Sequence, residues 1–231
     1  MLYDASRAGN AEATWFDRRW WQGRGEVRDS PEGRGSAAFI DADARRLVLR
    51  HYRRGGWMTR LLGDRYVWRG EALTRSFVEW HLLYVMHRAG LPVPLPIAAG
   101  YVRTGRNSYT ADLLTEQIPS SSSLARRLRS GPLTLTAWIA IGRCLRRFHD
   151  YGIYHADLNA HNVLLDDSET VWLVDFDRGG LRHPGYWCDA NLVRLRRSLE
   201  KITESMPPAQ FSEADWASLL DGYFTAAVRA A

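Results

Sequence analysis

The sequence predicts an α+β chain of two lobes, with a mainly antiparallel β-sheet and one helix in the first lobe and mostly helices in a small second lobe. Two stretches, residues 37–52 and 97–115, each place two apolar runs around a short polar turn, which is typical of β-hairpins. Residues 134–151, 189–202 and 211–227 repeat apolar side chains every three or four positions, which is typical of helices. A chain of 231 residues suits one compact domain or two lobes.

The composition is that of an ordered globular protein. Hydrophobic residues make up 45% of the chain and aromatic residues 12%, enough for a substantial core. No run of eighteen apolar residues occurs, and the chain does not open with a basic segment and an apolar core. We therefore expect neither a membrane-spanning helix nor a secretory signal, and a protein that stays in the cytoplasm. Cys144 and Cys188 have no metal-like spacing and are expected to be reduced thiols.

The charge of the chain is carried almost entirely by arginine. The formal net charge is +5, and Lys201 is the only lysine among 31 basic residues. Arginine suits forked, bidentate contacts with phosphate or carboxylate groups. Basic chains often bind nucleic acid, but this sequence holds no recognition helix, zinc finger or aromatic RNA-binding signature, so no nucleic-acid partner is expected.

The first lobe begins with a cluster of aromatic residues and arginines at residues 15–21. Two interpretations are open: a helix that packs on this lobe, which is favoured, or a face that lies at a membrane interface. Gly33 and Gly35 follow, directly before the hairpin of residues 37–52, and they either let the backbone approach a phosphate group or are ordinary turn residues. A helix is then predicted over residues 71–89.

The boundary between the lobes is predicted at the segment Glu116–Pro119, directly after the second hairpin. It gives an N-lobe of residues 1–117 and a C-lobe of residues 118–231. The serines of residues 120–123 offer an N-cap to a short helix at residues 124–129.

The C-lobe contains an ordered set of polar residues around two short strands. Asp157 is followed five positions later by Asn162, which directly precedes the apolar strand Val163–Leu165. A second strand, Val171–Val174, ends directly before Asp175. Because both residues lie at the same end of the paired strands, we expect Asn162 and Asp175 to lie side by side.

Phosphoryl transfer requires such a set of residues. The protein must orient the attacking hydroxyl group, hold magnesium against the nucleotide phosphates and neutralise charge on the leaving oxygen. Asp157 is placed to accept the hydroxyl proton, while Asn162 and Asp175 supply the hard oxygen ligands that Mg²⁺ prefers. The alternative is a solvated turn that happens to hold these residues, and the spacing combined with two correctly placed strands argues against it.

The pattern His-x-Asp-x-x-x-x-Asn, hairpin, Asp-Phe-x resembles the catalytic and metal-binding loops of protein-kinase-like folds. The resemblance implies ATP and Mg²⁺ as cofactors, with Gly33 and Gly35 close to the nucleotide phosphates. Arg50 stands at the place of the lysine that grips these phosphates in protein kinases, and Glu79 is its acidic partner. Glu116 belongs to the hinge, where backbone groups can meet an adenine edge.

The departures from protein kinases are also informative. Arg50 can carry the charge of the missing lysine with a different geometry. His51 is less suited than Arg50 to take the place of that lysine, because the side chains of neighbouring residues in a strand point to opposite faces of the sheet. The chain after Asp175 is too short for the large helical lobe of full protein kinases and has no Ala-Pro-Glu, so a protein substrate is disfavoured.

The motifs together look like those of the 3-deoxy-D-manno-octulosonic acid (Kdo) kinases. These are small kinase-like enzymes of lipopolysaccharide core assembly, related to the heptose kinases, and the likeness extends from about Gly33 to Lys201. The segments that carry it are His155–Asn162, Val174–Gly179 and Leu49–Gly56.

This resemblance implies ATP-dependent phosphorylation of the 4-hydroxyl group of Kdo in Kdo-lipid A, in Gram-negative bacteria. It implies an anionic glycolipid as the partner, peripheral contact with the cytoplasmic side of the inner membrane, and no known protein partner. Asp157 carries over as the base, and Asn162 and Asp175 as magnesium ligands. Asp177 stands where protein kinases have glycine, so their mobile-loop switching is not assumed.

An arginine-rich rim would attract an acceptor that carries carboxylate and phosphate groups. Arg178, Arg182 and His183 lie just beyond Asp175, and they either face the sugar acid or are ordinary loop charges. Surface association through arginines and aromatics can replace a membrane anchor.

Two alternatives to a Kdo kinase remain open. A heptose kinase, another small-molecule kinase or a protein kinase would use the same core, because the fold does not determine the acceptor. A kinase-like scaffold without turnover is suggested by the missing lysine. The intact set of Asp157, Asn162 and Asp175 counts against a scaffold.

Overall fold

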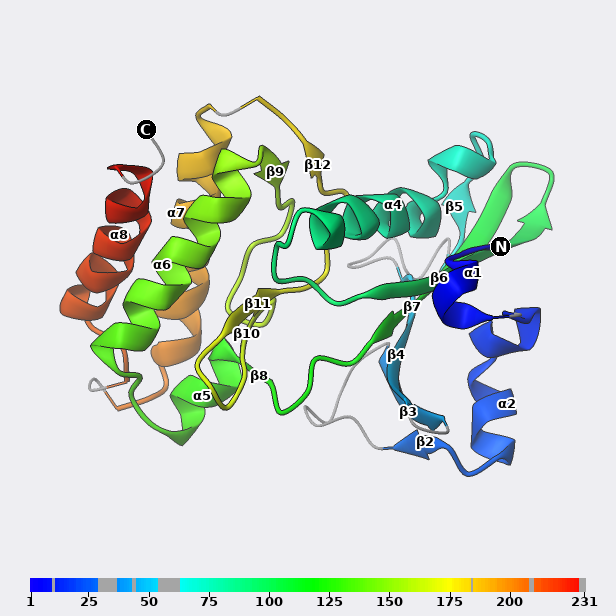
Figure 1. Ribbon diagram of the computed structural model, residues 1–231, viewed down its shortest axis with the longest axis horizontal. Helices are drawn as coiled ribbons and strands as arrows, with labels where there is room; N and C mark the ends of the chain where they lie inside the picture. Colours follow the sequence, from blue (N-terminus) through cyan, green and yellow to red (C-terminus); the bar gives the residue numbers. More distant parts are fainter. Residues whose placement is uncertain are drawn as a thin grey trace. The chain divides into compact units, whose positions relative to one another are not determined.

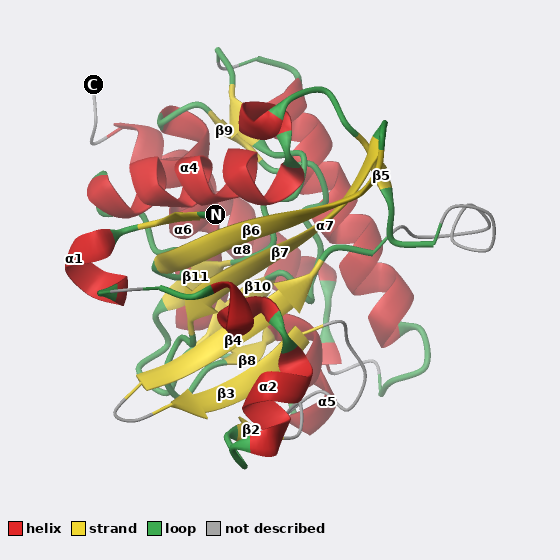
Figure 2. Cartoon of the chain, turned by 90° about the vertical axis from the view of Figure 1, so that its right-hand side faces the viewer, coloured by secondary structure: helices red, strands yellow, loops and turns green. Residues whose placement is uncertain are grey.

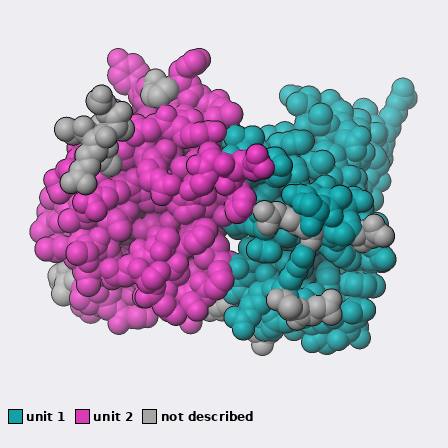
Figure 3. Space-filling view, in the orientation of Figure 1, with its two compact units in different colours: residues 1–85, 94–117 teal, residues 86–93, 118–231 magenta. Residues whose placement is uncertain are grey.

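The computed structural model describes residues 1–9, 11–28, 37–42, 45–53, 63–183, 185–207 and 210–228. The chain divides into two compact units (Figure 3), of which unit 1 comprises residues 1–85 and 94–117, and unit 2 comprises residues 86–93 and 118–231. Gly33 and Gly35, predicted to approach the nucleotide phosphates, lie outside the described residues.

Unit 1 is built on an antiparallel sheet in which β1, β6, β7, β4, β3 and β2 follow one another, with β5 also paired to β7. Figure 2 shows β3, β4, β7 and β6 side by side. Both predicted hairpins are present, as β3 with β4 and β6 with β7. The strands are β1 (Leu2–Tyr3), β2 (Val27–Arg28), β3 (Ala37–Ala42), β4 (Arg45–His51), β5 (Tyr66–Val67), β6 (Pro96–Gly105) and β7 (Ser108–Glu116).

One face of this sheet buries the aromatic N-terminal segment. Trp21 is only 3% exposed and shares an apolar core with Leu47 and Leu49 of β4. The indole Nε1 of Trp21 donates to the carbonyl oxygen of Trp15 at 2.8 Å, which satisfies its one polar group. Trp21 is therefore packed inside unit 1 and is not part of an exposed aromatic face. The short elements here are α1 (Ala5–Ala8), the 3₁₀ turn Ala13–Phe16 and α2 (Arg18–Gly23).

Helix α4 (Arg75–Arg88) begins later than the predicted start at Glu71. Residues Glu71–Leu73 form a separate 3₁₀ turn, and Thr74 follows in an extended conformation. The Thr74 hydroxyl donates to the carbonyl oxygen of Glu71 at 2.8 Å and closes that turn. A threonine side chain that competes for backbone groups is a known reason for a helix to begin after it.

Unit 2 is mostly helical, and Figure 1 shows α6, α7 and α8 lying together. The predicted serine cap is found, since the Ser123 hydroxyl accepts from the N–H of Arg126. The Thr134 hydroxyl, which was not predicted as a cap, accepts from the N–H of Ala137 in the same way. The helices are α5 (Leu124–Ser130), α6 (Leu135–Asp150), α7 (Trp187–Thr203) and α8 (Glu213–Val228).

Two glycines allow helices α6 and α8 to approach closely. A Cβ atom on Gly142 of α6 would lie 1.9 Å from the carbonyl oxygen of Leu219. A Cβ atom on Gly222 of α8 would lie 2.2 Å from the carbonyl oxygen of Ile139. Backbone atoms cannot retreat as a flexible side chain can, so this crossing requires glycine on both helices.

Short strands connect these helices to the loops of the site. Strands β11, β10 and β8 form one small sheet, and β12 pairs with β9 in another. Residues 86–93 belong to unit 2 through contacts such as the N–H of Leu173 with the carbonyl oxygen of Pro92, at 3.0 Å. The strands are β8 (Ser122–Ser123), β9 (Ile153–Tyr154), β10 (Val163–Leu165), β11 (Val171–Leu173) and β12 (Gly180–Leu181).

Candidate active site

The hairpin of β10 and β11 brings Asn162 and Asp175 to the same end of two paired strands. Val163 pairs with Leu173, and beyond this pair the N–H of Val174 donates to the carbonyl oxygen of Asn162 at 3.1 Å. Asp175 follows directly, with a φ of 63° that few residues other than glycine, asparagine and aspartate adopt readily. The structure therefore places the two predicted magnesium ligands next to each other.

The loop around Asp157 is held by amide side chains. The Nδ2 of Asn162 donates to the carbonyl oxygen of Asp157 at 2.9 Å, and the Nδ2 of Asn159 donates to Asp157 Oδ2 at 3.1 Å. The Asp157 side chain itself is 57% exposed. A carboxylate that is oriented by a neighbour and open to solvent can meet a substrate hydroxyl group.

His155 ties this loop to the strand that precedes Asp175. Its Nδ1 accepts from the N–H of Asp157 at 3.2 Å, so its Nε2 carries the proton and donates to the carbonyl oxygen of Val174 at 3.0 Å. Burial lowers the pKa of His155, which keeps the ring neutral. His155 therefore connects the loop of the predicted base, Asp157, to the residue directly before the predicted magnesium ligand Asp175.

The residue types at this hairpin fit a magnesium ion. Because the Nδ2 of Asn162 is used by Asp157, the amide presents its Oδ1 as the atom for a cation. Within the described ranges, no three His, Cys, Asp or Glu side chains group as a metal site. Magnesium bound to a nucleotide needs only one or two protein carboxylates, since phosphates and waters complete its octahedral shell. One amide oxygen and the Asp175 carboxylate satisfy that requirement.

In unit 1 the structure brings Arg50 and Glu79 into direct contact. The Nη2 of Arg50 bonds to Glu79 Oε2, and the hydroxyl of Tyr52 donates to the same oxygen at 2.6 Å. Glu79 is 2% exposed, and the guanidinium of Arg50 also lies over the Tyr52 ring at 4.5 Å. This buried carboxylate fixes the direction of the Arg50 guanidinium.

His51 points to the opposite face of β4 from Arg50, as strand alternation predicts. Its Nδ1 is 2.7 Å from Asp112 Oδ1, and its Nε2 is 2.8 Å from Asp64 Oδ2. The hydrogen bond with Asp112 is the main reason that the pKa of His51 is raised, although burial opposes it. A ring that bonds two carboxylates donates from both nitrogens and is positively charged.

Glu116 lies at the end of β7, where the hinge was predicted. Its N–H donates to the carbonyl oxygen of Leu95 at 2.9 Å, and the N–H of Gln117 donates to the carbonyl oxygen of Arg46 at 2.8 Å. The N–H groups of Glu116 and Gln117 therefore both bond within unit 1. Contact between this segment and an adenine edge stays a prediction, and it would have to use other groups of the segment.

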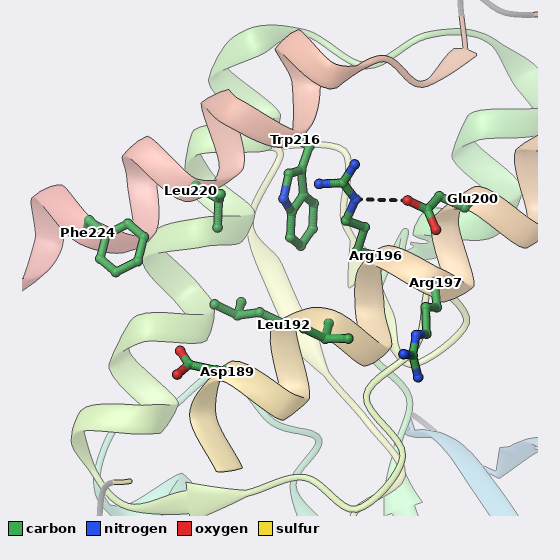
Figure 4. A pocket seen from close by; sticks show the side chains of 9 residues that line it. Asp189, Leu192, Arg196, Arg197, Glu200, Trp216, Leu220 and Phe224 are labelled. Carbon is green, nitrogen blue, oxygen red and sulfur yellow. Dashed lines mark hydrogen bonds and ion pairs between the residues drawn. The ribbon is translucent and has the colours of Figure 1, made fainter. Parts of the chain in front are cut away.

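A hollow of about 440 Å³ lies between α7 and α8 (Figure 4). Its floor is apolar, with Leu192, Trp216 and Leu220, and its rim carries Arg196 and Glu200. None of the predicted catalytic or metal-binding side chains lines it.

Sequence reasoning missed several supporting residues. Tyr52, Asn159 and His155 lie within the recognised segments, but their spacing did not reveal their contacts with Glu79, Asp157 and Val174. Asn191 lies outside those segments, and its partner His155 is 36 residues away. Only the three-dimensional arrangement identifies these roles.

An antiparallel sheet that carries an arginine–glutamate pair, and a helical unit that carries the Asp157, Asn162 and Asp175 loops, together define a kinase-like phosphotransferase. The comparisons with known proteins agree. The model of the Lipopolysaccharide kinase (Kdo/WaaP) family matches residues 18–223, and the chain belongs to this family. The family predicted from the motifs is thereby confirmed, and with it a phosphotransferase that acts on an alcohol group.

Curated relatives share much of the sequence. A 3-deoxy-D-manno-octulosonic acid kinase of Xylella fastidiosa (strain 9a5c) is 48% identical over 203 residues, which cover 87% of this chain and 80% of the relative. A 3-deoxy-D-manno-octulosonic acid kinase of Haemophilus influenzae (strain ATCC 51907 / DSM 11121 / KW20 / Rd) is 40% identical over 231 residues, 96% of this chain and 95% of the relative.

A solved structure confirms the fold class. This chain superposes on the structure described as WaaP in complex with acyl carrier protein with a TM-score of 0.55 and 17% sequence identity. The superposition covers 94% of this chain and 88% of the chain in that structure. No helix within the described part of this chain is long and apolar enough to span a membrane.

Proposed function

We propose that this protein is an ATP-dependent Kdo kinase, which phosphorylates the 4-hydroxyl group of Kdo in Kdo-lipid A during assembly of the lipopolysaccharide core. The observation that carries the proposal is the joined pair of loops in unit 2, where His155 and the bond between Val174 and Asn162 hold the predicted base beside the predicted magnesium ligands. Family membership and the names of the relatives support the choice of acceptor.

The residues of this chain divide the work of phosphoryl transfer. Asp157 accepts the proton of the attacking hydroxyl group, and Asn159 orients its carboxylate. Asn162 Oδ1 and the Asp175 carboxylate hold Mg²⁺, which neutralises charge on the nucleotide phosphates when it is bound. Arg50, held by Glu79, contacts these phosphates in place of a lysine.

The remaining nucleotide contacts belong to the same proposal. Gly33 and Gly35 are assigned to the phosphates, and Glu116 to the adenine side, on the resemblance alone. Unit 1 is accordingly the nucleotide-binding part and unit 2 the catalytic part. We place the enzyme at the cytoplasmic side of the inner membrane as a peripheral protein, because its acceptor is an anionic glycolipid.

The experiment that tests the proposal is phosphate transfer from labelled ATP and magnesium to purified Kdo-lipid A. Lipid A that lacks Kdo is the acceptor control, and Asp157→Asn is the matched variant, because it keeps the shape of the side chain without a base. We expect label on the Kdo-bearing lipid alone, and a fall in turnover of about 10²–10⁴-fold in the variant.

Folding and nucleotide binding are measured in parallel as magnesium-dependent thermal shifts with ATP, which Asp157→Asn should retain. Transfer to both lipids would refute Kdo as the acceptor. ATP binding without transfer to either lipid would favour a different acceptor or a scaffold.

A further inference from the structure

Helix α7 is attached to the catalytic loop at two points that the kinase-like motifs do not include. Asn191 is buried, and its Nδ2 donates to the carbonyl oxygen of His155 at 2.9 Å while its Oδ1 accepts from the N–H of His155 at 3.4 Å. Further along the helix, the Ser198 hydroxyl accepts from the N–H of Ala160 at 3.1 Å. His155 and Ala160 flank Asp157, so both sides of the base are fixed to one helix.

Arg194 lies between these two attachment points on the same side of α7. Residues three and four apart on a helix are neighbours, which places Asn191, Arg194 and Ser198 in one row. The Nη1 of Arg194 is 3.5 Å from Asp157 Oδ1, with the two side chains 53% and 57% exposed. An ion pair of this length and exposure contributes little to stability, so folding does not explain the position of this arginine.

We propose that Arg194 binds the carboxylate of the sugar-acid acceptor and thereby orients the hydroxyl group that Asp157 deprotonates. The inference rests on the proposed function, in which that acceptor is Kdo. The carboxylate and the reacting hydroxyl group belong to the same sugar, so a cation beside the base lies within reach of the carboxylate. A guanidinium fork matches a carboxylate in two parallel hydrogen bonds, and its loose pairing with Asp157 is readily exchanged.

The neighbouring charges of α7 agree with an anion-binding role. Arg197 and Lys201, both exposed, follow Arg194 at three and seven positions, and Arg197 also lines the hollow of Figure 4. Arg196 is used differently, because its Nε bonds to Glu200 at 2.8 Å beside the hollow of Figure 4. Arg194 is therefore the arginine of this helix that is positioned at the base.

The test is an equilibrium titration of the protein with free Kdo and with its methyl ester, which lacks the negative charge. For the wild type we expect the ester to bind about ten- to a hundredfold more weakly, the usual range for one lost charge-assisted contact. Arg194→Gln should bind acid and ester within about twofold of each other, and Arg194→Lys should give an intermediate ratio because it keeps the charge and loses the fork.

Arg143→Gln is the matched control, since Arg143 is an exposed arginine on another helix of unit 2 and the substitution removes the same charge. It should discriminate between acid and ester as the wild type does. Melting temperatures of all variants should agree within about 2 °C, because an exposed pair is lost. In turnover assays, Arg194→Gln should raise KM for Kdo-lipid A by a similar factor and leave KM for ATP unchanged.

The outcomes separate this inference from the function on which it rests. Equal discrimination by the wild type and Arg194→Gln, or a change confined to KM for ATP, overturns the role of Arg194 even if Kdo-lipid A is phosphorylated. Loss of discrimination in Arg194→Gln upholds that role even if the wild type transfers no phosphate to Kdo-lipid A, in which case only the proposed function fails.

Discussion

The functional side chains of this site are oriented by the neighbouring side chains that bond to them. Glu79 is buried, its carboxylate bonds to both Arg50 and Tyr52, and Arg50 in turn takes its direction from Glu79. A buried carboxylate that loses its partner is strongly destabilising. Arg50 is therefore expected both to stabilise the fold and to contact the nucleotide phosphates.

Replacement of Arg50 tests that combination. Arg50→Ala should lower turnover by at least a hundredfold, because a cation at the phosphates is removed, and should lower the melting temperature by several degrees. Steady-state kinetics and thermal unfolding measure the two effects. Tyr52→Phe is the control, since it removes a hydrogen bond to Glu79 but keeps the cation, and should lower stability with turnover near wild type. Wild-type kinetics in Arg50→Ala would show that another cation contacts the phosphates.

Elements of the sheet are also joined through His51, which links β4 to Asp112 of β7 and to Asp64. Its raised pKa in the folded protein means that this link stabilises the fold fully below the unfolded value of 6.5. The contribution is lost as the pH rises through the higher folded value.

The pH dependence of unfolding should therefore differ between the wild type and His51→Gln. As the pH rises above about 6.5, the wild type should lose more stability than the variant, because only the wild type gives up a proton from this ring. Melting temperatures measured at increasing pH test this difference. His155, whose pKa is lowered, has the opposite effect and is common to both proteins, so it cancels in the difference. Parallel curves would contradict the charged state assigned to His51.

Helices α6 and α8 provide a second prediction at this scale. Gly142→Ala forces a methyl group against the backbone of Leu219, and overpacking of this kind costs about 1–3 kcal/mol. We expect a fall in melting temperature of about 2–12 °C. Gly23→Ala in α2 is the matched control, because a Cβ there meets nothing within 4 Å, and alanine favours helix. An unchanged melting temperature for Gly142→Ala would mean that the crossing is looser than described.

The whole molecule combines a basic net charge with an N-terminal aromatic cluster that is used in packing. Trp21 is buried against the sheet and is not available for membrane contact, whereas the neighbouring Arg18 and Arg19 are exposed. Attraction between exposed charges is screened over about 10 Å at 0.1 M salt. Association with a membrane surface is therefore expected to depend strongly on ionic strength.

Vesicle sedimentation tests this expectation. The protein should sediment with anionic lipid vesicles at low salt, and binding should fall steeply as salt is raised to about 0.5 M. Vesicles of neutral lipid are the control. Absence of binding to anionic vesicles at every salt concentration would remove the peripheral-membrane part of the proposal.

Much of the fold follows from local pattern. The hairpins, the helices that begin after Ser123 and Thr134, and the adjacency of Asn162 and Asp175 all rest on contacts between residues close in sequence, which spacing can reveal. The late start of α4 was not predicted, because the hydroxyl of Thr74 rather than the apolar period decides it. Contacts such as Asn191 with His155 join residues 36 apart and leave no local signal.

The attachment of the catalytic loop to α7 has a consequence for synthesis of the chain on the ribosome. Every motif residue from His155 to Asp175 emerges before Asn191 and Ser198, the two residues that hold the loop from outside. A chain that ends before Trp187 would thus contain the complete kinase-like signature on a loop without its outer support. Phosphate transfer by such truncated chains, compared with chains that extend past α8, would show whether this support is needed before the enzyme becomes competent.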